Sequence, residues 1–307
     1  MNANSSPSTA LIGGTQVTSH QPVTAAARSE FAKTVRKLAR NRGAIAGMLF
    51  LVAIVLVAVF ANTIAPFDPL KQQYRDVLLS PSRTHLFGTD QFGRDVFSRV
   101  VVGSRQSLAV AALAIAIAAS IGITLGLVGG FAGGWLDMTI QRLIDIQLAF
   151  PGVLFALAIV AVLGPGLRNA MIAVGLSLVP SYARLVRGAV LSTKELAYID
   201  AARVLGAKDS RIVLRHILPN ILAPIVVLGT VSVAWAILIG SSLSFLGLGA
   251  QLPSPEWGLD LASGRDYLRE AWWMSTFPGL AIMLTVISVN LLGEGLREVL
   301  DPRLRAR

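Results

Sequence analysis

The chain has 307 residues, of which 54% are hydrophobic and only 14% are charged. This composition excludes an ordinary soluble domain, because apolar stretches recur at about 20 residues, the length of helix that crosses about 30 Å of hydrocarbon. The absence of cysteine excludes disulfides and thiolate metal sites. A net charge of +10 would suit nucleic acid, but its distribution instead indicates the excess of Lys and Arg found on the cytoplasmic side of membrane proteins.

The N-terminal stretch, residues 1–42, is predicted to be a cytoplasmic tail. Residues 1–27 are rich in Ser, Thr, Ala and Gly without an apolar period, which favours disorder. They are too long and too polar for a secretory signal peptide. Residues 28–42 carry six basic residues and one acid, which indicates an amphipathic segment on anionic lipid.

Recurring apolar runs predict an all-α polytopic membrane protein with six transmembrane helices. The first helix and the long polar loop behind it form the segment 43–106, and a five-helix core occupies 107–300. A cytoplasmic tail follows at 301–307. The helices are expected at 43–61, 107–130, 143–163, 169–189, 219–248 and 277–300. Pro151-Gly152 and Pro180 are expected to kink the third and fourth helices.

Small residues mark one face of the second predicted helix. Ala118, Gly122, Gly126 and Gly130 recur at every fourth position, a spacing that lets another helix approach closely. The approaching helix can belong to this chain or to a second one, and the sequence leaves both alternatives open.

Charge and aromatic residues orient the predicted helices. The segment 249–276 is polar and carries Trp257, Tyr267, Trp272 and Trp273, as expected at the outer interface. The segments predicted to be cytoplasmic carry about twice as many Lys and Arg residues as the outer segments. Both termini and the stretch 192–218 are therefore expected in the cytoplasm.

A polar stretch at 192–218 separates the fourth and fifth helices. Ser192 and Glu195 have the spacing of a capping box for a short helix, which Gly206 can end in the left-handed conformation. Asp209-Ser210 can cap a second short helix, and Pro219 suits the first turn of the next one. The stretch is therefore predicted to be a helix–turn–helix, called the elbow below.

The first helix of the elbow has little bulk on one side. Ala201, Ala202 and Gly206 leave a surface that can enter a groove on another protein closely. The alternative is a loop helix that merely lies on the membrane surface.

The same residues carry a family resemblance. Asp200-Ala201-Ala202, Gly206 and Leu218-Pro219 stand at the offsets of the "EAA" signature, which is E-A-A, three residues, Gly, nine residues, Ile, one residue and Leu-Pro. The chain thus resembles the permease subunits of ATP-binding-cassette importers. It departs from the signature at Asp200, where the family has Glu, and at His216, where the family has Ile.

The resemblance implies a fold, partners and a docking site. The fold expected is the MetI-like type I importer permease fold, in a bacterial plasma membrane. The partners expected are a second homologous permease, two ATPase subunits that carry ATP and Mg²⁺, and an extracytoplasmic substrate-binding protein. The elbow is expected to be the coupling helix that docks on an ATPase subunit, through Leu196, Tyr198, Asp200, Ala201, Ala202, Leu205, Gly206, Leu218 and Pro219.

Two further segments narrow the resemblance. Residues 85–99, dense in Gly, Asp and Arg, resemble the F-G-T-D-x-x-G-R-D-x-x-S-R segment of the "C" permeases of dipeptide, oligopeptide and nickel importers. Residues 245–258 resemble a second segment of that branch. Dipeptides or short oligopeptides are the substrates this implies, with nickel or another small solute as the alternative. A structural lid, whose Asp–Arg pairs contribute little if exposed, is the simpler interpretation of 85–99.

Few polar residues fall inside the predicted helices. Asp145, Arg184, Arg187 and Glu294 are expected near helix ends, where their side chains can reach water. Asn290 lies deepest and is the best candidate for lining a substrate path.

An ion-coupled secondary transporter would need buried ionisable groups at mid-helix, and an intramembrane enzyme would need paired catalytic residues; the sequence favours neither. A membrane scaffold or a channel is a further alternative, which would be favoured if the purified chain had no ATPase subunit attached.

No catalytic, cofactor or metal site is predicted in this chain. The phosphate-loop pattern G-x-x-x-x-G-K-[ST] is absent, so ATP is expected on partner subunits. The three histidines, His20, His85 and His216, are too scattered for a metal site.

Overall fold

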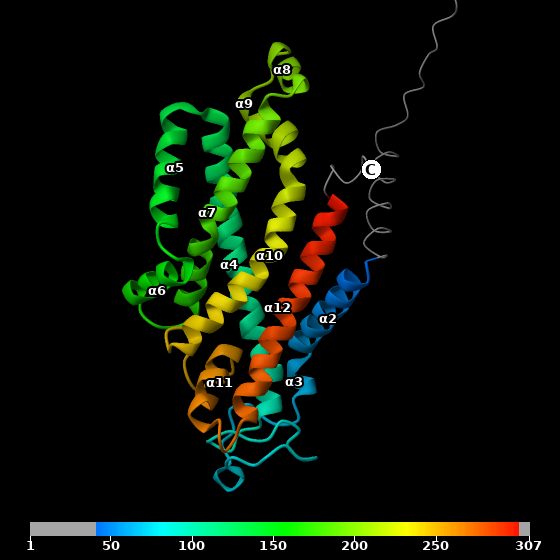
Figure 1. The fold of residues 1–307 in the computed structure, drawn as a ribbon, viewed down its shortest axis with the longest axis vertical. Coiled ribbons are helices and arrows are strands. Elements are labelled where there is room, and N and C mark those ends of the chain that lie inside the picture. Colours follow the sequence, from blue (N-terminus) through cyan, green and yellow to red (C-terminus); the bar gives the residue numbers. More distant parts are fainter. Residues whose placement is uncertain (1–40, 301–307) are drawn as a thin grey trace, which may run out of the picture.

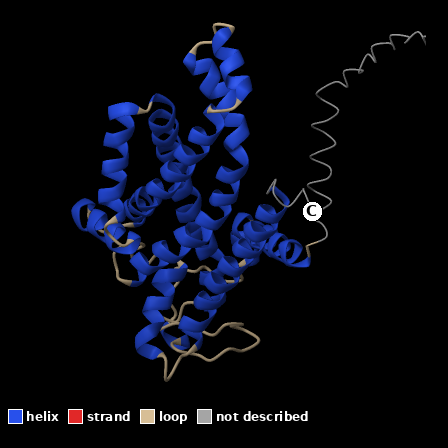
Figure 2. Cartoon of the chain, turned by 45° about the horizontal axis from the view of Figure 1, so that its top comes forward, coloured by secondary structure: helices blue, strands red, loops and turns tan. Residues whose placement is uncertain are grey.

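The computed structural model describes residues 41–300, so the predicted tails, apart from Asn41 and Arg42, lie outside the described residues. The described part is built from helices joined by short loops and one long loop (Figures 1 and 2). In chain order the helices are α2 (Arg42–Val59), α3 (Ala61–Ile64), η1 (Tyr74–Asp76), α4 (Val96–Ala132), α5 (Gly134–Leu148), α6 (Gly152–Leu163), α7 (Leu167–Lys194), α8 (Ala197–Val204), α9 (Asp209–Arg211), η2 (Ile212–Ile217), α10 (Leu218–Phe245), α11 (Trp257–Gly264), η3 (Arg265–Tyr267) and α12 (Trp273–Leu300).

Five of these segments are long and apolar enough to cross a membrane, or six if the bent pair α5–α6 forms one span. The predicted third helix, 143–163, is wrong in its bounds and its continuity. Its first part belongs to α5, which begins at Gly134, and the chain bends by 92° between α5 and α6. Pro151 precedes α6 and cannot donate a backbone hydrogen bond, so the break falls where a kink was expected.

The second predicted helix is also longer than expected. α4 begins at Val96 rather than at residue 107, because Asp95 caps it by accepting a hydrogen bond from the Ser98 backbone N–H at 2.8 Å. At 1.5 Å per residue, α4 is about 55 Å long, so its first turns extend beyond an ordinary hydrocarbon layer.

The small-residue face of α4 packs against α7 within this chain. A Cβ on Gly126 would lie 2.7 Å from the Ala183 carbonyl oxygen, and one on Gly130 would lie 3.0 Å from Val190 Cβ. Among residues 41–300, the contact between α4 and α7 is the most extensive between two helices. The intramolecular alternative is therefore confirmed for this face.

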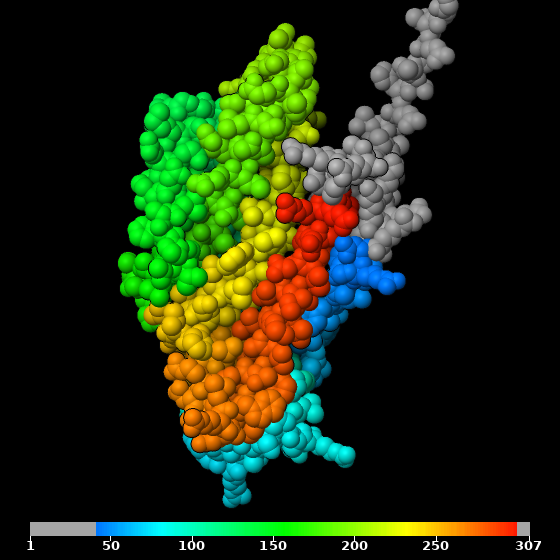
Figure 3. Space-filling model, in the orientation of Figure 1, coloured from blue at the N-terminus to red at the C-terminus, as the bar shows by residue number. Residues whose placement is uncertain are grey.

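The helices form one elongated body with two different ends (Figure 1). α10 packs against α4, α7 and α12, and α2 lies along α12. The end that carries α8 is called the elbow end. The opposite end, which holds residues 65–95 and α11, is called the loop end. In the space-filling view the elbow projects beyond the neighbouring helices (Figure 3).

Candidate functional site

The elbow begins later than its sequence suggests. Ser192 lies inside α7, Glu195 is the C-terminal cap residue of α7, and α8 starts after Leu196 without a side-chain cap. The predicted capping box is therefore wrong. Val190 and Thr193 are buried in the protein, and this packing extends α7 past Ser192.

α8 ends as predicted, with Gly206 following its last turn. Gly206 has φ +80°, the left-handed conformation that glycine adopts at little cost. The Gly206 N–H donates to the Arg203 carbonyl at 2.9 Å, and the Ala207 N–H donates to the Ala202 carbonyl at 3.0 Å. These two bonds form a Schellman motif, which satisfies the last carbonyls of the helix.

The second half of the elbow runs into α10 without a break. α9, the π-helical segment η2 and α10 form one continuous helical segment from Asp209 to Phe245. The predicted cap by Asp209-Ser210 is wrong, because Lys208 holds the cap position without a side-chain bond. Pro219 lies in the first turn of α10 as predicted, and its missing N–H explains the wider turn of the π-helix before it.

α8 is fastened to this second segment by a small set of contacts. Ile199 is fully buried in the same apolar cluster as Ile212 and Ile217. The Asn220 side-chain amide donates to the Tyr198 hydroxyl oxygen at 2.9 Å and to the His216 carbonyl at 2.6 Å. α8 therefore moves with α9 and α10 rather than as a free loop.

The C-terminal end of α8 exposes two apolar side chains. Leu205 is 86% exposed and Val204 87% exposed. Of the predicted docking residues, Leu196, Tyr198, Asp200, Ala201, Gly206 and Pro219 are exposed as well, whereas Ala202 and Leu218 are half-buried against the core. Sequence reasoning missed Val204, although an apolar side chain in a polar loop helix is itself a signal of a contact surface.

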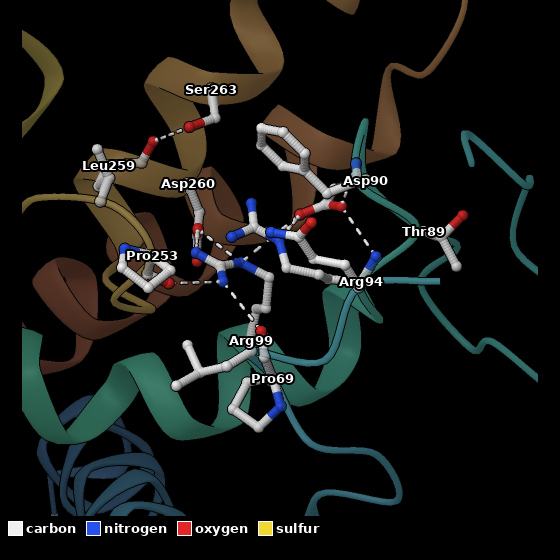
Figure 4. Close-up of polar contacts among 12 residues, drawn as sticks. Pro69, Thr89, Asp90, Arg94, Arg99, Pro253, Leu259, Asp260 and Ser263 are labelled. Carbon is white, nitrogen blue, oxygen red and sulfur yellow. Dashed lines mark hydrogen bonds and ion pairs between the residues drawn. The ribbon is translucent and has the colours of Figure 1, made fainter. Parts of the chain in front are cut away.

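The loop end is built on a buried charge cluster (Figure 4). Arg94 donates to Asp90 at 2.6 Å, and Arg99 Nε donates to Asp260 of α11 at 2.9 Å. Arg99 also donates to the backbone carbonyls of Pro69 and Pro253, at 3.1 and 3.2 Å. The four charged side chains are almost fully buried, so they are not the exposed pairs of little value that the simple lid interpretation assumed.

Two carboxylates of this end, those of Glu256 and Asp260, are buried in the protein. Burial raises the pKa of Asp260, and the adjacent Arg99 partly offsets this shift. Burial also raises the pKa of Glu256, which caps α11 by accepting from the Leu259 N–H at 2.9 Å and takes a further bond from Ser107 at 3.0 Å. Through these bonds α11 is joined to α4 and to residues 85–99.

Four charged residues of the long helices form two ion pairs between α5 and α7. Asp145, in the last turn of α5, and Arg184, ten residues before the end of α7, form an ion pair of 2.9 Å. Asp137 and Arg187 pair by two bonds of 2.6 Å each. Asn290 is exposed on α12, on the same side of the helix as Ile287.

No group of three or more His, Asp or Glu side chains that could hold a metal ion occurs among residues 41–300.

Comparison with protein families gives two matches. Residues 122–306 match the model described as "Binding-protein-dependent transport system inner membrane component". Residues 29–81 match the model described as "N-terminal TM domain of oligopeptide transport permease C".

Several relatives are similar along almost the whole chain. The dipeptide transport system permease protein DppC of Alkalihalophilus pseudofirmus is 45% identical over 278 residues, which cover 91% of each chain. The di/tripeptide transport system permease protein DppC of Pseudomonas aeruginosa is 46% identical over 277 residues, covering 88% of this chain and 91% of the relative. The glutathione transport system permease protein GsiD of Shigella flexneri is 49% identical over 271 residues, covering 88% and 89%.

Among solved structures, the fold is similar to that of the MetNI methionine ABC transporter in an inward-facing conformation. The TM-score is 0.53 at 19% identity, and the match covers 66% of this chain and 96% of that chain. This likeness confirms the predicted MetI-like fold and concerns the fold alone.

Proposed function

Because the chain belongs to the family of inner-membrane components of binding-protein-dependent transport systems, we propose that it is the permease subunit of an importer of dipeptides and related short peptides. The proposed substrate class is supported by the similarity to permeases named for dipeptides, di/tripeptides and glutathione. These relatives are 45–49% identical to this chain over about nine-tenths of its length. The chain is a multi-pass inner-membrane protein and not itself an ATPase, since ATP is bound by partner subunits. Nickel or another small solute is the alternative cargo.

The proposed assembly has a second homologous permease, two ATPase subunits and a substrate-binding protein. The elbow end faces the cytoplasm in this proposal, and the loop end faces the binding protein. The bias of Lys and Arg toward the predicted cytoplasmic segments supports this orientation. The exposed apolar tip of α8, Val204 and Leu205, supports docking of the elbow on an ATPase subunit.

The proposed mechanism is alternating access driven through the elbow. When ATP closes the ATPase dimer, α8 is displaced with it. Two residues separate α7 from α8, and α10 continues the segment whose Ile212 and Ile217 share a buried cluster with Ile199 of α8, so both helices receive the displacement. Coupling requires that the elbow contact the ATPase differently in its two states, because contact alone shifts no equilibrium. Asn290, exposed on α12, is proposed to line the path that opens.

The docking proposal is tested with the assembled importer in proteoliposomes. Ala201→Trp adds bulk on an exposed position of α8, so the elbow itself should still fold, whereas a change at half-buried Ala202 or at Gly206 would strain it. Import should fall severely while the amount of permease in the membrane stays unchanged. Thr139→Trp, exposed on α5, is the matched control. Undiminished import in Ala201→Trp would contradict docking through this surface.

The substrate class is tested separately. Dipeptide, glutathione and nickel are compared as cargo, each with the binding protein that co-purifies with the importer. Saturable uptake of a dipeptide that depends on ATP supports the proposal. ATP-dependent uptake of nickel alone would replace it with the alternative.

A further inference from the structure

The carboxylate of Asp260, the member of the buried charge cluster that lies on α11, has hydrogen-bond partners on only one of its two oxygens. Arg99 Nε donates to Asp260 Oδ1 at 2.9 Å, and Arg99 Nη2 donates to the same oxygen. Asp260 Oδ2 is buried and has no partner among residues 41–300. A buried carboxylate oxygen that accepts no hydrogen bond raises the free energy of the folded protein, so this oxygen needs a donor.

Arg99 cannot supply that donor, because all five of its N–H groups are already used. Two of them serve Asp260 Oδ1. Nη1 donates to the carbonyls of Pro69 and Pro253, at 3.1 and 3.2 Å (Figure 4). Nη2 gives its second N–H to the carbonyl of Ser254 at 3.3 Å. The donor for Asp260 Oδ2 must therefore come from elsewhere.

A second buried oxygen at the loop end also lacks a donor. Gln91 follows Asp90 in the turn before α4, and its Oε1 is buried without a partner in the part of the chain that the structure describes. An amide oxygen only accepts hydrogen bonds, as does an ionised carboxylate. The two oxygens therefore cannot satisfy each other, and both require an N–H or O–H directed at them.

Gln91 and Asp260 line one small cavity. Its volume is about 10 Å³. This is about the smallest space that holds one water molecule, and it is too small for any larger ligand. The cavity lies where the segment 85–99, α4, α11 and the start of α12 meet, and its other lining residues are Asp90, Val96, Arg99, Ser263 and Met274.

The charges around the cavity favour a neutral ligand. The cluster already balances two aspartates against two arginines, all of them almost fully buried: Asp90, Arg94, Arg99 and Asp260. A cation such as Na⁺ would add a buried charge without a counter-charge, which is costly. An anion would meet two oxygens that only accept hydrogen bonds. A water molecule carries no net charge and offers two O–H donors, one for each oxygen.

We propose that this cavity binds one water molecule, which donates one hydrogen bond to Asp260 Oδ2 and the other to Gln91 Oε1. Two polar partners are the fewest that hold a buried water in place. Gln91 is then a positioning residue for α11. Arg99 holds one oxygen of Asp260 from α4, and the water joins the other oxygen to the segment 85–99. The proposal concerns this chain alone and does not depend on which solute is transported.

The site is tested first by a structure of the assembled importer at a resolution that shows ordered water. Density for one atom is expected within hydrogen-bond distance of Asp260 Oδ2 and Gln91 Oε1. A direct contact between the two side chains, with no density between them, would overturn the proposal. Such a contact arises if the Gln91 amide is turned so that Nε2 donates to Asp260. It also arises if Asp260, whose pKa is raised by burial, is protonated and donates to Gln91.

Met274 gives a second measurement, in solution. Its side chain lines the cavity and is only 3% exposed, so reagents in the bulk solvent reach it poorly. A short X-ray pulse converts a bound water molecule into a hydroxyl radical, which oxidises an adjacent methionine to the sulfoxide. Oxidation of Met274 in the assembled importer, measured by mass spectrometry, is therefore expected despite its burial. A Met274 side chain that stays unoxidised would contradict a water at this site.

A matched pair of variants assigns the oxidation to the proposed water. Gln91→Leu removes one of the two acceptors, so oxidation of Met274 should fall roughly tenfold, because one partner does not hold a buried water. Gln72→Leu makes the same change at an exposed glutamine of the same loop and should leave the oxidation of Met274 unchanged. Equal oxidation of Met274 in Gln91→Leu and in the unmodified importer would overturn the proposal. If Gln91→Leu does not assemble, the density and the oxidation in the unmodified importer still decide.

Discussion

The two ends of the molecule are held together in different ways. At the loop end, Arg99 reaches α11 and two backbone carbonyls from buried positions, so segments far apart in the sequence are locked together. At the elbow end, α8 is attached through Ile199 and the amide of Asn220, and its outer surface is open. The difference indicates a rigid cap at one end and a part suited to exchange of contacts at the other.

The largest effect is expected from breaking the rigid cap. Arg99→Met removes the partner of Asp260, which is left as a buried carboxylate with a still higher pKa. Loss of one member of a buried pair costs about 3–5 kcal/mol, so thermal unfolding of the purified importer should occur at a clearly lower temperature. Arg265→Met, which breaks an exposed pair with Asp266, is the control and should change little. Equal unfolding temperatures in the two variants would show that the cap does not depend on its buried charges.

A smaller effect is expected where α8 joins the second half of the elbow. Ile199→Ala removes a fully buried side chain, at a typical cost of about 2–5 kcal/mol that here falls on the attachment of α8. Proteolysis should increase within 196–206, and ATP hydrolysis should continue with less import per ATP. Leu214→Ala, exposed on η2, controls for the loss of apolar volume alone. Unchanged proteolysis would mean that α8 is held by contacts other than Ile199.

Local signals in the sequence predicted the parts of the elbow that depend on backbone chemistry. Gly206 ends α8 because of its left-handed φ, and Pro219 starts α10 because it needs no N–H donor there. The two predicted caps failed because tertiary packing decided instead: burial of Val190 and Thr193 carries α7 past Ser192, and η2 joins α9 to α10. A capping pattern cannot reveal either effect.

Two other features could not be predicted from one sequence for different reasons. The first part of α5 was missed because Asp137, Gln141 and Arg142 interrupt its apolar residues, so the predicted apolar run began only at 143. The pairing of Arg99 with Asp260 joins residues 161 positions apart, and no local pattern encodes it. The resemblance of 85–99 to a family segment pointed to the region that holds the charge cluster, but it did not reveal that these charges are buried.

At the elbow surface the expected effect on stability is smaller still, although the effect on assembly is not. Leu205→Ala shortens a side chain that is 86% exposed, so the unfolding temperature of the permease should stay the same. If Leu205 is an anchor of the docking surface, affinity for the ATPase subunits should fall about tenfold, equivalent to about 1.4 kcal/mol. Co-purification at graded salt and detergent measures this. Leu214→Ala, exposed on η2, is the matched control, and equal losses in both variants would argue against a specific anchor.

The smallest effect is expected from the charge that departs from the family signature. Asp200 pairs with Arg203 at 3.3 Å, and both side chains are largely exposed, so the pair contributes at most about 1 kcal/mol. Asp200→Asn should leave stability unchanged. Asp200→Glu restores the family residue and adds one methylene of reach, so it should support import at least as well as the natural residue. Import that falls in Asp200→Glu but not in Asp200→Asn would show that the docking surface tolerates loss of this charge but not extra length, which would place Asp200 inside a closely fitted contact rather than at its rim.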